Sequence, residues 1–219
     1  MKRISMLFVL ICTSRASCFS QTNAGFLCNS ASNNFFAGNY AAAVTNLTAE
    51  IALNPRDYNA YLHRGMSRYW LHDYVGAIAD YDKAIQLNPQ CGGFYCNRGQ
   101  SKFALNDMTG ALADYNKAIE LDTNMAIAYF NRGQLKYCAD NNFTGAIADF
   151  TKAIELHTDP QEDDIFFARA NAKMQLKDFT GAVTDFTKTI ELNPNHEQAR
   201  TNLVVAQKAL RASEKKQLR

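Results

Sequence analysis

The chain has 219 residues, 47% of them hydrophobic, which is the composition of a folded protein with a continuous core rather than of a disordered polymer. The first twenty residues contain three of the 23 basic residues and none of the 21 acidic ones, so residues 21–219 carry 20 basic and 21 acidic residues, a net charge of −1. This near-neutral body is a poor electrostatic match for a nucleic-acid backbone, and we expect no nucleic-acid partner.

Residues 1–20 have the layout of a secretory signal peptide. A basic start is followed by an apolar run over residues 4–12, and then by small and polar residues. The run is shorter than the about 20 apolar residues that a membrane-spanning helix needs. We therefore expect cleavage near Ser20, which leaves Gln21 as the first residue of an exported, periplasmic or secreted protein without a transmembrane segment.

Two alternatives remain for this N-terminal segment. One is lipid attachment at Cys18, although Arg15 stands three residues before it, where a lipoprotein signal normally has an apolar side chain. The other is an uncleaved cytoplasmic protein.

Four cysteines follow the expected signal peptide: Cys28, Cys91, Cys96 and Cys138. An even number in an exported chain permits disulfides, but the spacing matches neither a disulfide scaffold nor a CxxC metal or redox site. We favour thiols that pack as small apolar groups, and we expect no metal and no cofactor.

A motif centred on an Arg-Gly pair recurs every 34 residues, with its glycine at Gly65, Gly99 and Gly133. The tetrapeptide NRGQ occurs twice in this motif. A second anchor is an alanine with an aromatic residue four positions later: Ala77 and Tyr81, Ala111 and Tyr115, Ala146 and Phe150, Ala182 and Phe186. A third anchor is Leu-Asn-Pro, which ends three of the repeats.

Each period reads as two short helices joined by a polar turn such as His72-Asp73. Apolar and small residues recur at helical spacing, and Asn-Pro ends the second helix because proline lacks an N–H donor and clashes with the preceding turn. Small residues in the first helix and alanines in the second allow close approach of the helix axes, while the aromatic residue fills the remaining space. The motif is therefore mainly architectural.

A 34-residue helix-turn-helix period with these anchors in phase resembles the tetratricopeptide repeat family. The resemblance implies an all-α fold, a right-handed superhelical solenoid of about five repeats. The expected repeats are 24–57, 58–91, 92–125, 126–162 and 163–196, of which the fourth holds three extra residues. The main departures from the family pattern are Glu50 and Thr189, which replace an expected alanine, and Thr123, which replaces proline.

Residues 197–219 are expected to form a capping helix with a basic tail. Its apolar stripe would consist of Ala199, Leu203, Val204, Ala206 and Leu210. The basic end is interpreted as a solvated helix terminus, with docking of acidic partners as the alternative.

Four repeats carry both an arginine in the first helix and an aspartate in the second, and repeat one carries neither. This joint presence and absence suggests that the two side chains pair and fix the stacking of the repeats; the alternative is separate solvent-facing charges. The pairs are Arg64 and Asp80, Arg98 and Asp114, Arg132 and Asp149, and Arg169 and Asp185.

The resemblance also implies a concave groove lined by the first helix of each repeat. Carried onto this chain, the peptide-groove residues are Asn29, His63, Met66, Trp70, Asn97, Gln100, Phe103, Asn131, Gln134, Tyr137 and Asn171. This wall is amidic and aromatic, a chemistry that suits a peptide backbone and apolar side chains. We interpret Asn97 and Asn131 as peptide clamps; the alternative is that they are merely wetted residues of a scaffold.

The cations of the family's carboxylate clamp, which grips chaperone C-termini, are missing, so we do not expect that ligand. The four histidines, His63, His72, His157 and His196, are scattered, and no catalytic motif occurs, so we expect no enzyme. The sequence predicts a protein-interaction scaffold that binds an extended peptide or a partner helix in the groove. The alternative is a structural protein that self-associates through its convex face or its ends. The partner's identity is not encoded in these patterns.

Overall fold

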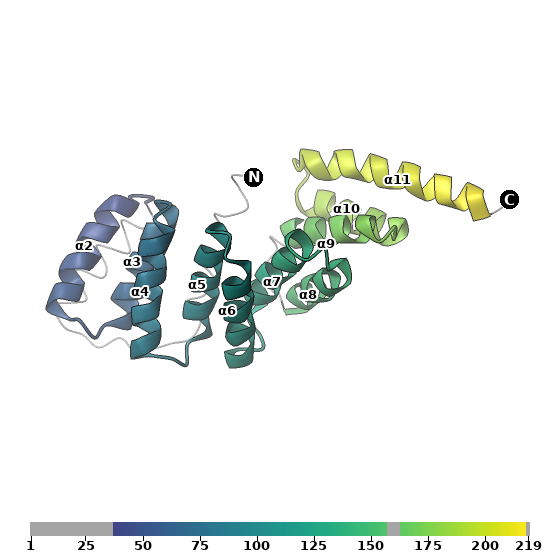
Figure 1. The fold of residues 1–219 in the computed structure, drawn as a ribbon. Coiled ribbons are helices and arrows are strands. Elements are labelled where there is room, and N and C mark those ends of the chain that lie inside the picture. The colour runs from purple at the N-terminus through teal and green to yellow at the C-terminus, as the bar shows by residue number, and fades with distance from the viewer. Residues whose placement is uncertain (1–36, 157–162, 218–219) are drawn as a thin grey trace. The chain divides into compact units, whose positions relative to one another are not determined.

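The computed structural model describes residues 37–156 and 163–217 (Figure 1). The described residues are helical and contain no strand, which confirms the expected all-α fold of consecutive helix-turn-helix repeats. The expected signal peptide, the first helix of repeat one, and the end of repeat four lie outside these ranges.

Two compact units make up the chain, divided between Thr123 and Asn124. In the described part of the N-terminal unit, each helix packs against the next one along the chain (Figure 1). Its helices are α2 (Tyr40–Leu53), α3 (Tyr58–Trp70), α4 (Tyr74–Leu87), α5 (Gly92–Ala104) and α6 (Met108–Leu121).

The C-terminal unit follows the same plan and ends in a longer helix. Helix pairs again pack in chain order, and the last helix packs on α10. Its helices are α7 (Ala126–Cys138), α8 (Phe143–Leu156), α9 (Asp163–Gln175), α10 (Phe179–Leu192) and α11 (Glu197–Gln217).

The turn inside a helix pair is built by one residue with positive φ followed by an aspartate cap, or by an asparagine cap, Asn142, before α8. At the start of α6, Asn106 has φ of 65°, and the Asp107 side chain accepts the backbone N–H of Gly110 at 2.9 Å. Such a cap satisfies one of the unpaired N–H groups of the first helical turn. A Cβ at Gly110 would meet the capping carboxylate, so a side chain there would force the cap to shift. The same aspartate caps start α4 and α10, through Asp73 and Asp178.

The glycine of the Arg-Gly motif permits contact with the aromatic residue of the second helix. A Cβ placed on Gly99 would lie 2.8 Å from the Tyr115 ring, and one placed on Gly65 would lie 2.7 Å from the Tyr81 ring. Both tyrosines are almost fully buried. The periodic glycine thus serves packing, because any side chain would displace a core ring.

Alanines and aromatic rings dominate both cores. In the N-terminal unit, Ala77, Tyr81 and Phe94 are buried together with Leu47 and Met66. The core of the C-terminal unit includes Ala182 and Phe186, against which Phe167 packs, and α11 closes it with Ala199 and Ala206, which are fully buried. Because α11 covers this end of the core, it has the position expected for a capping helix.

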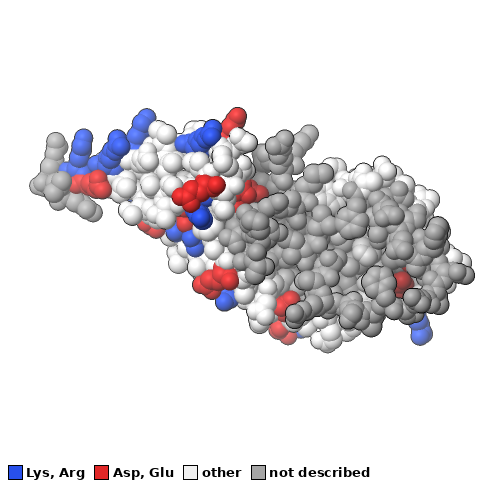
Figure 2. Space-filling model, turned by 180° about the vertical axis from the view of Figure 1, so that it is seen from behind, with Lys and Arg blue, Asp and Glu red and all other residues white. Residues whose placement is uncertain are grey.

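Val204, which was expected in the apolar stripe of α11, is not part of the stripe that the structure buries. Val204 is 50% exposed, as is its neighbour Val205 at 52%, while Leu203 and Leu210 are half-buried. The buried stripe therefore follows Ala199, Leu203, Ala206 and Leu210, which a helix places on one side. Basic residues on the opposite side, among them Arg200, Lys208 and Arg211, are exposed, and Figure 2 shows basic side chains along this helix.

Candidate functional site

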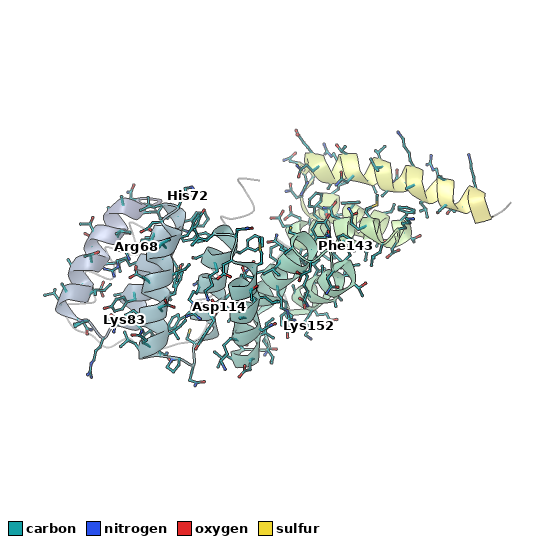
Figure 3. The ribbon with its side chains drawn as sticks, in the orientation of Figure 1. Arg68, His72, Lys83, Asp114, Phe143 and Lys152 are labelled. Atoms are coloured by element: carbon teal, nitrogen blue, oxygen red, sulfur yellow. The ribbon has the colours of Figure 1, made fainter. Side chains whose placement is uncertain are left out.

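A buried carboxylate on the second helix of four helix pairs is held by an arginine from the first helix of the same pair. Arg98 on α5 donates Nε to one oxygen of Asp114 at 2.9 Å and Nη2 to the other at 2.6 Å. Asp114, which Figure 3 labels on α6, is only 3% exposed. The structure brings all four arginines into such contact: Arg64 with Asp80, Arg98 with Asp114, Arg132 with Asp149, and Arg169 with Asp185.

A second cation completes each cluster, one helical turn after the arginine. Lys102 Nζ lies 2.8 Å from Asp114, and Arg68 Nη1 lies 2.7 Å from Asp80. In the C-terminal unit, Lys136 and Lys173 take this position beside Asp149 and Asp185. Sequence analysis missed this second cation, although its recurrence four residues after the arginine is visible in the chain.

Arg98, Arg64 and Arg169 also bond to the preceding helix pair. Arg98 Nη1 donates to Asp82 on α4 at 2.6 Å, and Arg64 Nη1 donates to Thr48 on α2 at 3.2 Å. Arg169 makes the equivalent bond to Thr151 on α8 at 3.1 Å. One guanidinium thereby links three helices, so these clusters hold consecutive repeats together within each unit.

These charges serve structure. Hydrogen bonds to Asp114 and Asp82 raise the pKa of Arg98 further above its ordinary value, against the opposing effect of burial. Each guanidinium also lies over an aromatic ring one turn earlier, as Arg98 does over Tyr95 at 5.4 Å. The arginine side chains are therefore engaged in contacts within the fold rather than available for binding a ligand.

The first helices of the N-terminal unit present a different set of side chains. His63, Met66 and Trp70 lie on α3, and Asn97, Gln100 and Phe103 lie on α5, where Asn97 and Gln100 match His63 and Met66. Met66 and Asn97 are 3% and 5% exposed, and the other four are half-buried. We call these six residues the α3/α5 face.

Two polar nitrogens of the α3/α5 face are buried at the same position of consecutive repeats: Nδ1 of His63 and Nδ2 of Asn97. Nδ2 of Asn97 has no hydrogen-bond partner, whereas the His63 ring interacts with the Asn59 backbone, one turn earlier on α3. Burial lowers the pKa of His63, against smaller raising effects of the Asp57 charge and the Asn59 backbone, so its imidazole is neutral near pH 7. Sequence analysis selected both residues but expected an open wall, and the structure instead buries the Asn97 amide.

Aromatic rings extend this face toward the end of α3. Trp70 stacks on Tyr40 from α2 with ring centroids 5.8 Å apart, and Tyr69 contacts Trp70 edge-on at 5.9 Å. Tyr69 also meets Tyr74 of α4 at 5.4 Å. Half-buried rings of this kind offer apolar surface that is already held in place.

The predicted groove residues of the C-terminal unit lie on α7 and α9. Asn131 is 7% exposed, and Gln134 and Tyr137 are half-buried. Asn171 on α9 accepts a hydrogen bond at Oδ1 from Nδ2 of Asn202 on α11 at 3.0 Å, so the capping helix uses that oxygen. Asn29 lies outside the described residues.

Asp163, Asp164 and His196 converge beside the start of α11, with one candidate ligand atom from each within 4.8 Å of the others. His196 Nδ1 accepts the backbone N–H of Ala199 at 3.1 Å, which caps α11. A neutral imidazole that accepts at Nδ1 carries its proton on Nε2, so neither nitrogen is a good metal ligand. Sequence analysis missed this cluster because His196 is more than thirty positions from the two adjacent aspartates in the chain.

Glu50 is another buried group that sequence analysis noted only as a departure from alanine. It is 1% exposed, and neither carboxylate oxygen has a hydrogen-bond partner. Burial, and secondarily the charge of Asp57, raises the pKa of Glu50 above its ordinary value. Thr189, at the same position of repeat five, instead donates its hydroxyl to the Asp185 carbonyl at 3.0 Å.

Three cysteines fall within the described residues, and none of them is in a disulfide there. Cys96 is buried, Cys91 is half-buried and Cys138 is exposed. Cys28 lies outside the described ranges.

Family models match the chain in three places. A model described as "TPR repeat" covers residues 99–137, and models described as "Tetratricopeptide repeat" cover residues 58–91 and 163–196. The chain is a tetratricopeptide repeat protein. Such repeats are typically non-enzymatic interaction modules, and this chain is a protein-protein interaction scaffold.

Solved structures show the same fold at low sequence identity. MamA from Desulfovibrio magneticus RS-1 is 22% identical, with 81% of this chain and 99% of that chain covered and a TM-score of 0.67. TTC0263, a thermophilic TPR protein of Thermus thermophilus, is 18% identical, with coverages of 84% and 98% and a TM-score of 0.67. YrrB, described as a TPR protein with an unusual peptide-binding site, is 20% identical, with coverages of 80% and 89% and a TM-score of 0.62. No curated protein matches the chain.

None of the helices in the described ranges combines the length and the apolar character that a membrane crossing requires.

Proposed function

We propose that the α3/α5 face binds a peptide segment of a partner protein. The observation that carries this proposal is Asn97 Nδ2, a buried amide nitrogen without a hydrogen-bond partner, with Nδ1 of His63 buried at the same position of the preceding repeat. Leaving a buried hydrogen-bonding group unpaired costs about 1–3 kcal/mol, so the Asn97 amide needs a compensating role. A polypeptide backbone supplies both donors and acceptors to such groups.

The aromatic neighbours support the same role. Trp70 lies two turns after His63 on the same side of α3, and Trp70 is fixed by Tyr40 and Tyr69. Held aromatic surface binds an apolar side chain with little loss of conformational entropy. A peptide would therefore gain hydrogen bonds at His63 and Asn97 and apolar contact beside them. A peptide would gain access to the buried Asn97 amide through changes in side-chain rotamers on this face, which are common when interfaces form.

YrrB, which shares the fold, is described as having a peptide-binding site, and that supports peptide binding as a use of this architecture. In the C-terminal unit, Asn131, Gln134 and Tyr137 on α7 form a second candidate face of the same chemistry. Asn171 has less hydrogen-bonding capacity left for a peptide, because its side-chain oxygen already accepts a hydrogen bond from Asn202.

A display library of random peptides, selected on the full chain, tests this function. We expect enriched peptides whose binding is weakened by His63→Ala or Asn97→Ala and unaffected by Gln86→Ala, a change at an exposed position of α4. Enriched peptides whose binding ignores all changes on the α3/α5 face would move the interface to another surface.

Self-association is the second candidate, and one observation favours it. Val204 and Val205 form an exposed apolar pair on α11. Molecular mass measured as a function of concentration separates the two functions: a constant mass supports partner binding, and a rising mass that Val204→Lys abolishes supports assembly through α11.

Residues 1–20 are proposed to direct export. Mass determination on the protein recovered from its native source tests this: loss of residues 1–20 with Gln21 at the N-terminus is the expected result, and retention of Met1 would contradict it.

A further inference from the structure

The outward side of α11 carries a row of exposed cations. They are Arg200, Lys208, Arg211 and Lys215, and the exposed Val204 stands between the first two. Because a helix has 3.6 residues per turn, this spacing places all five side chains on one side. That side faces away from the stripe that packs on α10, and Figure 2 shows basic side chains along the helix. We call these five residues the α11 row.

Cations on the preceding helices are paired, whereas those of the α11 row are not. Every arginine and lysine on α3, α5, α7 and α9 lies against the buried aspartate of its helix pair. On α6, α8 and α10 a lysine meets the glutamate three residues later, as Lys117 meets Glu120 at 2.7 Å. Among the residues that the structure describes, no carboxylate lies at ion-pair distance from the α11 row.

The position of these cations within the helix does not explain them. Positive charge is favourable near a helix C-terminus because of the helix dipole, but the effect falls off beyond the last turn. Since α11 ends at Gln217, Lys215 is the one member of the row in that turn. Arg211 follows Lys208 by three residues, where α6, α8 and α10 have a glutamate, and like charges at such a spacing destabilise a helix. An anionic partner would relieve this repulsion.

The charge of the whole chain is divided in the same way. Residues 197–219 contain six basic and two acidic residues, whereas residues 21–196 contain 14 basic and 19 acidic residues. The positive charge that is free to act on a partner is therefore concentrated on the capping helix. The α11 of a second copy would meet the row with like charges, so the row favours a different, acidic partner.

We infer that the α11 row docks an acidic segment of a partner protein, with carboxylates against its four cations and an apolar side chain against Val204 and the neighbouring Val205. Both valines are about half exposed, at 50% and 52%. From residue 200 to residue 215 the row is about 22 Å long, which matches about four turns of a partner helix. The inference uses no residue of the α3/α5 face, so it stands independently of peptide binding there.

A membrane surface fits this helix less well. A helix that lies in a membrane interface buries a broad apolar face among the lipids. The apolar face of α11 is already used inside the protein, because Ala199 and Ala206 are fully buried in the core and Leu203 packs against it. The outward side offers two valines among cations, which suits carboxylates with one apolar contact.

Fluorescence polarisation with three labelled helical peptides of equal length tests the partner class on the full chain. The first peptide has glutamates along one side and leucine at its centre; the second has glutamine for glutamate, and the third has serine for leucine. We expect the first to bind most tightly and the second not to bind. Raising the salt concentration from about 0.05 M to about 0.5 M should weaken the first by about tenfold or more.

Two triple variants then locate the binding surface. The row variant should weaken the glutamate-leucine peptide by about tenfold or more and keep or raise the thermal midpoint, because like charges are removed. It consists of Arg200→Gln, Lys208→Gln and Arg211→Gln. The control variant removes the same number of charges from α6, α8 and α10 and should leave the affinity unchanged. It consists of Lys117→Gln, Lys152→Gln and Lys188→Gln.

Four results would overturn the inference. The glutamate-leucine peptide could fail to bind, or both variants could weaken it equally, which would mean attraction to the net charge alone. Binding to vesicles of phosphatidylcholine with about one-third phosphatidylserine, lost in the row variant and without binding of the peptide, would replace the acidic protein by a lipid surface. A fall of several degrees in the midpoint of the row variant would show that these cations serve the helix itself.

Discussion

Glu50 is a single residue that departs from the repeat pattern at a buried position. Glu50 stands where three other repeats have Ala84, Ala118 and Ala153, all fully buried. Its carboxyl group is equally buried but has no hydrogen-bond partner. This buried, unpaired carboxyl group lowers the stability of the fold, a loss that the alanines at this position of the other repeats avoid.

Replacing Glu50 by alanine is expected to stabilise the protein by about 1–3 kcal/mol near pH 7, because an unpaired buried carboxyl is removed. Chemical denaturation of both proteins measures the change. A less stable Glu50→Ala variant would show that the carboxyl group has a compensating contact.

The pH dependence of this gain follows from the raised pKa of Glu50. The folded pKa lies above the ordinary value of 4.5, so the folded state binds the proton more tightly than the unfolded state does. The free energy of unfolding therefore falls as pH rises from the ordinary value through the folded pKa. Glu50→Gln should remove that part of the pH profile; parallel wild-type and variant profiles would contradict the assignment.

Gly99 illustrates a residue whose identity is dictated by close packing. Gly99→Ala is expected to destabilise the protein by about 1–3 kcal/mol, because the added methyl group meets the Tyr115 ring. In a double-mutant cycle, Tyr115→Leu should make the alanine nearly harmless by freeing space. Additive losses would mean that Gly99 is needed for another reason.

At the scale of helices, the arginine and aspartate clusters determine how neighbouring helix pairs hold together. Arg98 links α5 to both α6 and α4, through Asp114 and Asp82. The sequence predicted that arginine and aspartate pair, but it did not specify the contact to the preceding helix pair. The structure shows that Arg98 bonds both within its own helix pair and to the preceding one.

Removing the central carboxylate by Asp114→Ala should cost about 3–5 kcal/mol, because Arg98 and Lys102 then remain part-buried without their shared counter-ion. Asp107→Ala, which removes only a helix cap, should cost about 1 kcal/mol and serves as the control. Equal thermal midpoints for wild type and Asp114→Ala would show that the cluster does not hold the repeats together.

Helix type and the polar turns followed from the sequence, because the 3.6-residue periodicity and Asn-Pro act locally. The aspartate caps were not predicted, although Asp-x-x-Gly at these turns is visible in the chain. The juxtaposition of arginine and aspartate could be inferred from their joint occurrence across repeats. The burial of individual side chains could not be inferred from the sequence. Whether Asn97 is open to solvent depends on neighbouring side chains that are distant in the sequence. The same limit applies to the Asn171–Asn202 bond, whose partners are 31 positions apart.

For the whole molecule, repetition gives similar helix pairs that differ in a few side chains. Repeats two and three share the helix pair, the capped turn and the charge cluster, yet they present His63 and Asn97 at the matching position. Because the shared residues are used to build the fold, function is expected where the side chains are not needed for it. The α3/α5 face is such a place within the N-terminal unit.

The central claim is that Asn97 is a ligand-binding group, and the most direct measurement is the NMR signal of its side-chain amide in the full chain. On titration with a peptide selected from the display library, the two Nδ2 proton resonances of Asn97 should shift in a saturable way and become protected from exchange with water. Shifts confined to α11 or to the second helices, with the Asn97 amide unchanged, would contradict the account.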